Sequence, residues 1–218
     1  MGSITTLIPI VIGYLLGAIP AGLIVARCFG VRDIRKEGSG NIGATNVWRV
    51  VGPGAAIWVY VFDIGKGVVA LLIARQFDPT IFSRDLLLVI CAVAVVLGNI
   101  FPVYLSFKGG KGVNTSLGAM LVLLPWETLI CVAIFILVVW WTRFISLGSI
   151  VGALSLCLIL AGERFLMDRA IADVYLYLGA ALALVILLSH RQNIRRLVAG
   201  TENRFSLSSK TGKAGSHV

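Results

Sequence analysis

The sequence predicts an all-α membrane protein with seven transmembrane helices, its N-terminus outside and its C-terminus in the cytoplasm. Of the 218 residues, 58% are hydrophobic and only 13% are charged, whereas soluble domains carry about 25% charged residues. Long apolar runs, several of them near the roughly 20 residues that cross a bilayer, follow one another with short polar connections. We expect one membrane domain over residues 1–205. Residues 206–218, rich in serine, glycine and lysine, are predicted to form a disordered cytoplasmic tail.

The predicted spans come from apolar runs, of which the fourth is divided into two helices. Pro125, Trp126 and Glu127 lie near its middle, and a proline beside a carboxylate is costly at the centre of a lipid-facing helix. A turn on the outer side tolerates both the tryptophan and the charge. Division there raises the number of spans from six to seven. The six runs lie at about residues 4–26, 55–74, 86–105, 117–141, 147–160 and 174–189.

Basic residues set the predicted orientation. No lysine or arginine precedes the first run, and Arg27, Arg32 and Arg35 follow it, so this run is interpreted as a retained helix and not as a signal peptide. Seven spans place most of the nineteen lysines and arginines in the cytoplasm, as the positive-inside rule requires. Six spans would move the basic segment after His190 to the outside. Parity therefore favours seven.

The charge and the cysteines narrow the class of partner. The net charge is +9, and because the bases lie in loops between apolar runs, we expect membrane lipids and phosphorylated substrates as partners and no nucleic acid. The four cysteines show no paired spacing and have no neighbouring histidines. A zinc site and a disulfide framework are both poorly supported, and we expect neither a metal nor a cofactor.

The first cytoplasmic loop reads GSGNIGATNVWR over residues 38–49. It contains GxGxxG, but no strand precedes it, and Ala44 and Thr45 stand where a P-loop has lysine and serine or threonine. Its glycines nevertheless let backbone N–H groups converge on an anion such as phosphate. The alternative is a flexible polar loop that only links two helices. The candidate ligands are Gly38, Ser39, Gly40, Asn41, Gly43, Thr45, Asn46 and Arg49.

A later loop offers a second phosphate site. Lys108, Gly109, Gly110 and Lys111 come just before a predicted helix, and helix N-termini attract anions. Lys111 has glycine on both sides and can approach a ligand closely. Ordinary positive-inside charge is the alternative, mainly for Lys108.

Near the last helix, His190 and Asn193 share one face if the segment is helical. A lone histidine is more often structural than catalytic, although this one lies at the depth of the basic loops. Ser146 and a second serine three residues later follow Arg143 at a helix start, and their position alone predicts helix caps.

The second predicted span contains Asp63 and Lys66, one helical turn apart. Unpaired charge is costly inside a membrane, so we expect them to form a structural pair. Direct catalysis by either residue is the alternative.

Three segments together resemble the bacterial acyl-phosphate:glycerol-3-phosphate acyltransferases, the PlsY family: GSGNIGATNVWR, FPVYLSFKGGKGVNT and HRQNIRRLVAGTENR. The resemblance implies an enzyme of the bacterial cytoplasmic membrane whose active site faces the cytoplasm. It implies transfer of a fatty acyl group from acyl phosphate to the 1-hydroxyl of glycerol-3-phosphate, giving lysophosphatidic acid and phosphate. We expect catalytic roles for Ser39, Arg49, Lys111, His190 and Asn193. The remaining expected binding residues include Ser146 and Glu202, which rest on the resemblance.

The sequence departs from the family pattern at Asn99, where the family usually has histidine, and at Asn114, where alanine is usual. We expect Asn99 to donate a hydrogen bond in place of the histidine.

Two substrates that each carry a phosphate repel one another, and the basic residues are expected to offset this repulsion. Acyl phosphate is already activated, so no acyl-enzyme is required. The base is either the donor's own phosphate or His190. A transporter of a phosphorylated anion and a CDP-alcohol phosphotransferase are the competing classes. Clustered bases on one face disfavour the first, and the isolation of Asp63 disfavours the second.

Overall fold

The computed structural model describes residues 2–79, 81, 83–167, 169 and 171–205, and every regular element within these residues is a helix. The predicted tail, residues 206–218, lies outside them, so its disorder stays a prediction. The elements are α1 (Gly2–Ala18), α2 (Ala21–Cys28), η1 (Ile34–Lys36), α3 (Ala44–Val50), α4 (Pro53–Ala74), α5 (Arg84–Ile100), η2 (Val103–Leu105), α6 (Val113–Leu123), α7 (Pro125–Thr142), α8 (Ile145–Phe165), α9 (Asp173–Ser189) and α10 (Arg191–Val198).

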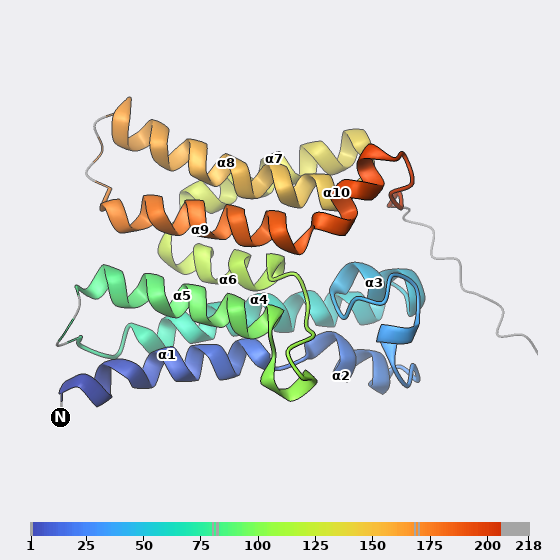
Figure 1. The fold of residues 1–218 in the computed structure, drawn as a ribbon, viewed down its shortest axis with the longest axis horizontal. Helices are drawn as coiled ribbons and strands as arrows, with labels where there is room; N and C mark the ends of the chain where they lie inside the picture. The colour runs from blue at the N-terminus through green and yellow to red at the C-terminus, as the bar shows by residue number, and fades with distance from the viewer. Residues whose placement is uncertain (1, 80, 82, 168, 170, 206–218) are drawn as a thin grey trace, which may run out of the picture.

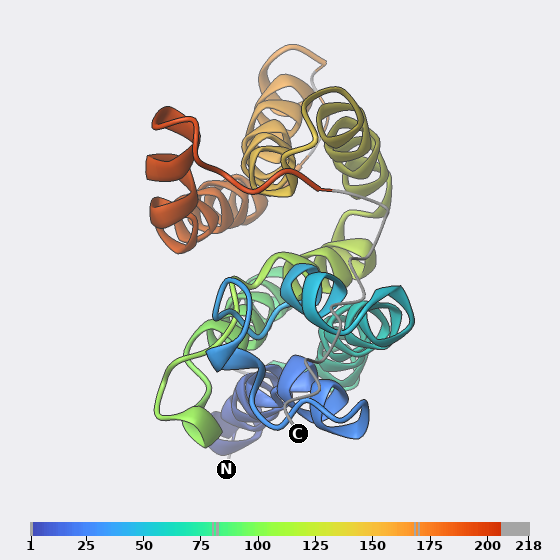
Figure 2. The ribbon, with the colours of Figure 1, turned by 90° about the vertical axis from the view of Figure 1, so that its right-hand side faces the viewer.

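The long helices form two groups that lie side by side (Figures 1 and 2). In the first, α1 packs on α5 and α4 packs on α6, while in the second α8 lies between α7 and α9. Contacts between α6 and α7 and between α5 and α9 join the groups. Glycines let the helices approach: a Cβ at Gly118 on α6 would lie 2.0 Å from the Ile64 carbonyl oxygen on α4. Small residues of this kind are typical of helix packing in membranes.

The expected division of the fourth run is confirmed, because α6 ends at Leu123 and α7 begins at Pro125. The first run is not one continuous helix, since Pro20 separates α1 from α2. Among the described residues, five helical segments are long and apolar enough to span a membrane, and a sixth is obtained if α9 and α10, bent by 63°, are counted together. The seventh expected span is α6, which has 11 residues.

The shortness of α6 follows from the path of the preceding loop. After η2 the chain turns back along the end of α5: the Gly109 N–H donates to the Ile100 carbonyl at 3.0 Å, and the Gly110 N–H donates to the Asn99 carbonyl at 2.9 Å. A Cβ at Gly109 would lie 2.2 Å from the Asn99 oxygen, so only glycine permits this return. Lys111 thereby lies beside the end of α5, just before α6 begins.

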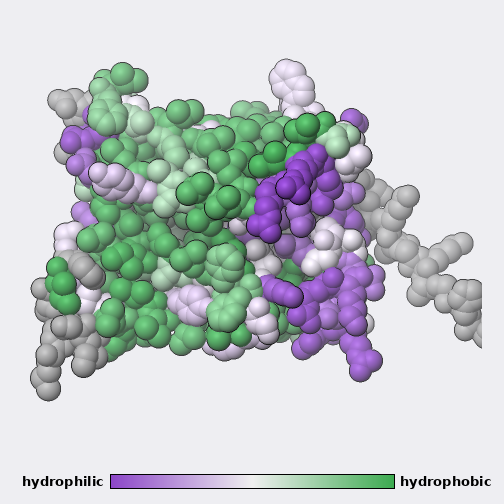
Figure 3. Space-filling model, in the orientation of Figure 1, coloured by the Kyte–Doolittle hydropathy of each residue, from purple (hydrophilic) through white to green (hydrophobic). Residues whose placement is uncertain are grey.

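The surface confirms that the protein is an integral membrane protein. Figure 3 shows a broad apolar body with hydrophilic residues gathered at the end where α2, α3 and α10 lie. Trp126 at the start of α7 and Trp140 and Trp141 at its end are all at least 74% exposed. Tryptophans at both ends of an apolar helix mark the two membrane interfaces.

Candidate active site

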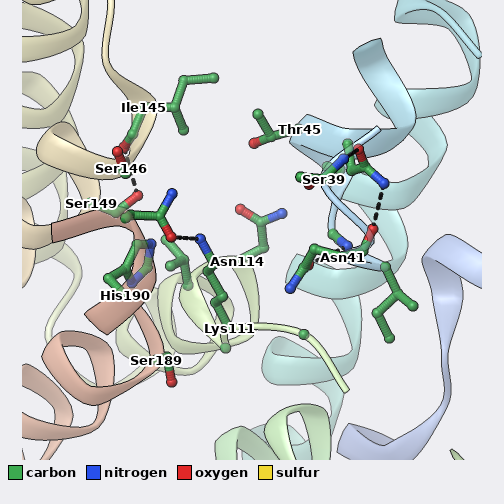
Figure 4. Close-up of a pocket in the computed structure, with 18 of the residues that line it drawn as sticks. Ser39, Asn41, Thr45, Lys111, Asn114, Ile145, Ser146, Ser149, Ser189 and His190 are labelled. Carbon is green, nitrogen blue, oxygen red and sulfur yellow. Dashed lines mark hydrogen bonds between the residues drawn. The ribbon is translucent and has the colours of Figure 1, made fainter. Parts of the chain in front are cut away.

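A polar cavity of about 770 Å³ lies at the hydrophilic end and is lined by residues of both helix groups. In Figure 4, Ser39, Asn41 and Thr45 lie on one side and Ser146, Ser149 and His190 on the other, with Lys111 and Asn114 between them. The structure thus brings together the three predicted loops. The predicted residues that line the cavity are Ser39, Asn41, Gly43, Thr45, Asn46, Arg49, Lys108, Gly109, Gly110, Lys111, Ser146, His190, Asn193 and Glu202.

The first loop is shaped by the side chain of Asn46, which is only 2% exposed. Its amide nitrogen donates to the carbonyls of Ile34, Glu37 and Asn41, at 3.3, 3.0 and 2.9 Å. Its amide oxygen accepts from the Ser39 N–H at 2.8 Å. Because these bonds use both N–H groups of the amide, Asn46 positions the loop around the cavity and offers no N–H to a ligand.

The two glycines at the start of this loop, which were expected to bind phosphate, lie outside the lining of the cavity. Gly38 and Gly40 adopt left-handed backbone conformations, with φ of 58° and 73°, and neither lines the cavity. A Cβ at Gly38 would lie 2.3 Å from the amide oxygen of Asn46. They therefore allow the turn that presents Ser39 to the cavity.

Lys111 reaches across the cavity from the first helix group to the second. Its ammonium group donates to the amide oxygen of Asn193 on α10. Burial lowers the pKa of Lys111 to about 8; the carboxylate of Glu202 opposes this effect, and the charges of Arg196 and Arg49 add to it. Lys111 is thus a cation near neutral pH and loses its charge in mildly alkaline solution.

Glu202 is the centre of the opposite wall. One carboxylate oxygen accepts from the Ser146 hydroxyl at 3.0 Å and from the Asn193 amide at 2.7 Å, and the other accepts from Arg196 at 2.8 Å. Burial raises the pKa of Glu202, but the three hydrogen bonds and the charge of Arg196 outweigh it and hold the pKa below its ordinary value. The ionised Glu202 carboxylate therefore orients Ser146, Asn193 and Arg196 on this wall of the cavity.

The expectation that the two serines cap α8 is wrong. Phe144 precedes the helix as its N-cap residue, without a side-chain hydrogen bond. Ser146 donates to Glu202, and Ser149 donates to the Ile145 carbonyl one turn back at 2.9 Å. The position of Ser146 near a helix start predicted a cap, whereas its hydrogen-bond partner, Glu202, lies 56 residues later in the sequence.

His190 lies at the bend between α9 and α10 and is 2% exposed. Its Nδ1 is 2.9 Å from the Ile186 carbonyl, which can only accept, so Nδ1 carries the proton and Nε2 is the nitrogen able to accept one. Asn193 follows one turn later, and both residues line the cavity as their spacing predicts.

Asn99 forms a hydrogen bond at this position, but the expectation that it donates is wrong, because its side chain accepts. Its amide oxygen receives the Gly112 N–H at 3.0 Å and so fixes the residue next to Lys111. Asp63 and Lys66 form the expected buried ion pair at 2.8 Å, and Lys66 also donates to the Ile19 carbonyl.

Sequence reasoning missed the contact between Trp48 and Phe205. Their ring centroids lie 5.3 Å apart, and the Phe205 N–H donates to the Arg143 carbonyl at 2.7 Å. The segment after α10, which lines the polar cavity with Asn203 and Phe205, therefore joins α3 to the second group. Spacing gave no signal for it.

A second cavity, of about 340 Å³ and mainly apolar, lies between α6, α7, α8 and α9. It shares part of its wall with the polar cavity, so the two cavities adjoin. The shared residues are Tyr60, Val113, Asn114, Phe135 and Ser149.

Comparison with known proteins points to one family. The sequence matches the family model described as glycerol-3-phosphate acyltransferase over residues 7–200. The glycerol-3-phosphate acyltransferase 1 of Deinococcus radiodurans is 45% identical over 203 residues, which cover 93% of this chain and 96% of the relative. The glycerol-3-phosphate acyltransferase of Syntrophomonas wolfei is 42% identical over 197 residues, covering 90% and 95%.

Two crystal structures of PlsY (YgiH), an integral membrane glycerol 3-phosphate acyltransferase, share the fold. The glycerol 3-phosphate form superposes with a TM-score of 0.81 at 36% identity and covers 92% of this chain and 96% of that one. The lysophosphatidic acid form gives 0.79 at 35% identity, covering 93% and 96%.

Proposed function

Because the chain belongs to the glycerol-3-phosphate acyltransferase family, we propose that it transfers a fatty acyl group from an acyl phosphate to the 1-hydroxyl of glycerol-3-phosphate. The family expected from the three loops is thereby confirmed. The observation that carries the proposal is that two cavities adjoin: one is lined by polar and basic residues, and the other is mainly apolar. A substrate with a phosphate head and an acyl tail matches this pair.

The basic residues offset the charge of two phosphates. Arg49 and Lys108 line the polar cavity from the first group, Arg196 lines it from the second, and Lys111 reaches between them. A phosphate dianion beside Lys111 stabilises its charged form and counteracts the effect of burial on its pKa. Such preorganised cations stabilise charge that develops on the departing phosphate.

The reaction needs no covalent acyl-enzyme. The 1-hydroxyl oxygen of glycerol-3-phosphate attacks the acyl carbonyl carbon, the bond from that carbon to the phosphate oxygen breaks, and inorganic phosphate leaves. The hydroxyl proton passes to the departing phosphate, with Ser39, His190 and Asn193 orienting the substrates. His190 is the alternative base, because its Nε2 is the nitrogen able to accept a proton.

The donor is proposed to be acyl phosphate and not acyl-CoA. A CoA thioester presents an adenine nucleotide and a long arm, whose recognition takes a sizeable site with specific polar contacts. The polar cavity has the composition of a phosphate site: glycines, lysines and arginines. The compact headgroup of an acyl phosphate fits that composition better.

The proposed topology has seven spans in one domain over residues 1–205, with the N-terminus outside and the polar cavity facing the cytoplasm of a bacterial inner membrane. Counting α6 as a span gives the seventh crossing, which the return of the loop before it shortens. The positive-inside rule then places the basic end, where α2, α3 and α10 lie, in the cytoplasm.

A direct assay tests the donor and the reaction together. The purified protein is given glycerol-3-phosphate with palmitoyl phosphate or with palmitoyl-CoA at matched concentrations, and lysophosphatidic acid and released phosphate are measured. Product from the acyl phosphate alone is expected. Comparable turnover with the thioester would overturn the donor assignment. Flux of a phosphorylated anion into vesicles, without acyl transfer, would favour the transporter alternative.

A further inference from the structure

The apolar cavity has one end beside the polar cavity, here called its mouth, and an opposite end lined by buried residues, here called its closed end. At the mouth, Val113, Phe135 and Ser149 belong to both cavities. From each of these residues the lining continues for seven residues along a helix, on α6, α7 and α8, which corresponds to about 10 Å at 1.5 Å per residue. The lining ends at Met120, Thr128, Leu156 and Leu182, all of which are at least 94% buried.

The depth of this cavity is less than the length of a long acyl chain. The hydrocarbon core of a bilayer is about 30 Å thick, so one leaflet, and the extended chain of a membrane lipid within it, measures about 15 Å. A chain whose headgroup occupies the polar cavity enters through the shared mouth. It then meets the closed end before its full length is accommodated. Cavity depth therefore distinguishes chains by length.

One residue lies midway between mouth and end without a side chain. Gly152 is one turn beyond Ser149 on α8 and lines the cavity. A Cβ added there would lie 3.6 Å from the Cys131 carbonyl oxygen and 3.8 Å from the Phe135 Cβ, which are ordinary contacts. Gly148 differs, because its added Cβ would lie 2.6 Å from a Val139 methyl group. Gly148 permits helix packing, whereas Gly152 leaves space open.

We propose that Gly152 is a specificity-determining residue: the absence of a side chain there sets how long an acyl chain the enzyme accepts. The inference rests on the proposed function, since it takes the acyl phosphate headgroup to be in the polar cavity. Gly152 contacts the chain and not the reacting atoms, so its effect is on chain preference and not on the chemistry.

The test uses one variant that fills part of the apolar cavity and one that enlarges it. Gly152→Leu fills the cavity about 5 Å beyond the mouth and should raise the ratio of kcat/KM for butanoyl phosphate, whose chain ends near that depth, over palmitoyl phosphate at least about tenfold. Leu156→Ala opens the closed end and should lower the same ratio. The control is Gly162→Leu, the same change on the same helix, outside the cavity and with open space around it. It should leave the ratio unchanged.

The outcomes separate the two proposals. If the wild-type protein makes no lysophosphatidic acid from any of these acyl phosphates, the proposed function fails. If it makes product but Gly152→Leu and Leu156→Ala keep the wild-type ratios, the assignment of Gly152 alone fails. Should Gly152→Leu not fold, as judged by thermal melting in detergent, the shift with Leu156→Ala still decides.

Discussion

The two walls of the polar cavity are held in different ways. On one side, the neutral amide of Asn46 and two left-handed glycines shape the first loop through its own backbone. On the other side, the carboxylate of Glu202 gathers Ser146, Asn193 and Arg196, three side chains from α8 and α10. The first wall depends on backbone geometry, and the second on charge. Mutation, pH and conservative replacement should therefore affect them differently.

The largest effect is expected at Asn46. Asn46→Leu keeps the side-chain size but removes four hydrogen bonds to the loop backbone and leaves the Ser39 N–H and the Asn41 carbonyl without these partners, each at a cost of about 1–3 kcal/mol. The loop should rearrange and kcat/KM should fall at least about a hundredfold. Asn46→Asp keeps the acceptor and loses the donors, so it should be nearly as impaired. Wild-type kinetics in both variants would show that the loop is not held by this amide.

Lys111, which connects the two walls, should rank second. Lys111→Ala removes the cation that bridges to Asn193, and kcat/KM is expected to fall at least about tenfold, equivalent to roughly 1.4 kcal/mol of charge stabilisation. Arg49→Ala removes another cation that lines the polar cavity and should show a similar loss of kcat/KM. Both lie in polar segments, so melting temperatures in detergent should stay near wild type. Unchanged kinetics in both would refute the two-phosphate arrangement.

The pH dependence of activity should report on the charge of Lys111. Because burial lowers the pKa of Lys111 to about 8, its cation is present below that pH and is lost as the pH rises through it. The kcat/KM for acyl phosphate, which reflects the free enzyme, should decline above about pH 8, by roughly tenfold for each further unit. In Lys111→Arg the decline should move to higher pH, since arginine keeps its charge. An identical alkaline limb in this variant would assign the titration to another group.

The sequence predicted the roles of the residues in the amide-held wall less well than the roles of the charged residues. Glycine spacing identified the first loop as a phosphate site, but spacing alone could not show that Gly38, Gly40 and Asn46 build the loop while Ser39 faces the cavity. The apolar runs predicted the helical membrane fold, and Pro125 predicted the break between α6 and α7. The return of the chain at Gly109 depends on a hydrogen bond to α5, a tertiary contact that hydropathy does not record.

The contact between Trp48 and Phe205 joins the two sides of the polar cavity, and its loss should have a smaller effect. An aromatic pair contributes about 0.5–1.5 kcal/mol beyond its buried area. Phe205→Ala should therefore lower kcat/KM by roughly threefold to tenfold. Phe165→Ala, at the far end of α8 and exposed, is the matched control and should have no effect. An equal loss of kcat/KM in both variants would mean that the contact between Trp48 and Phe205 has no special role.

The smallest effect is expected at Asn99, whose side chain holds the backbone next to Lys111. Its amide oxygen only accepts the Gly112 N–H, and a histidine ring nitrogen can accept the same bond, so neither residue needs to transfer a proton. Asn99→His should change kcat/KM by no more than about twofold, within roughly 0.5 kcal/mol. Asn99→Leu, which cannot accept, leaves the Gly112 N–H unpaired, loosens the backbone next to Lys111 and should cost about 1–3 kcal/mol. A well-folded Asn99→His protein without activity would contradict the acceptor role, because it would show that the amide does something at this position that an imidazole cannot. Comparable activity in the histidine and leucine variants would show instead that the Gly112 bond does not position Lys111.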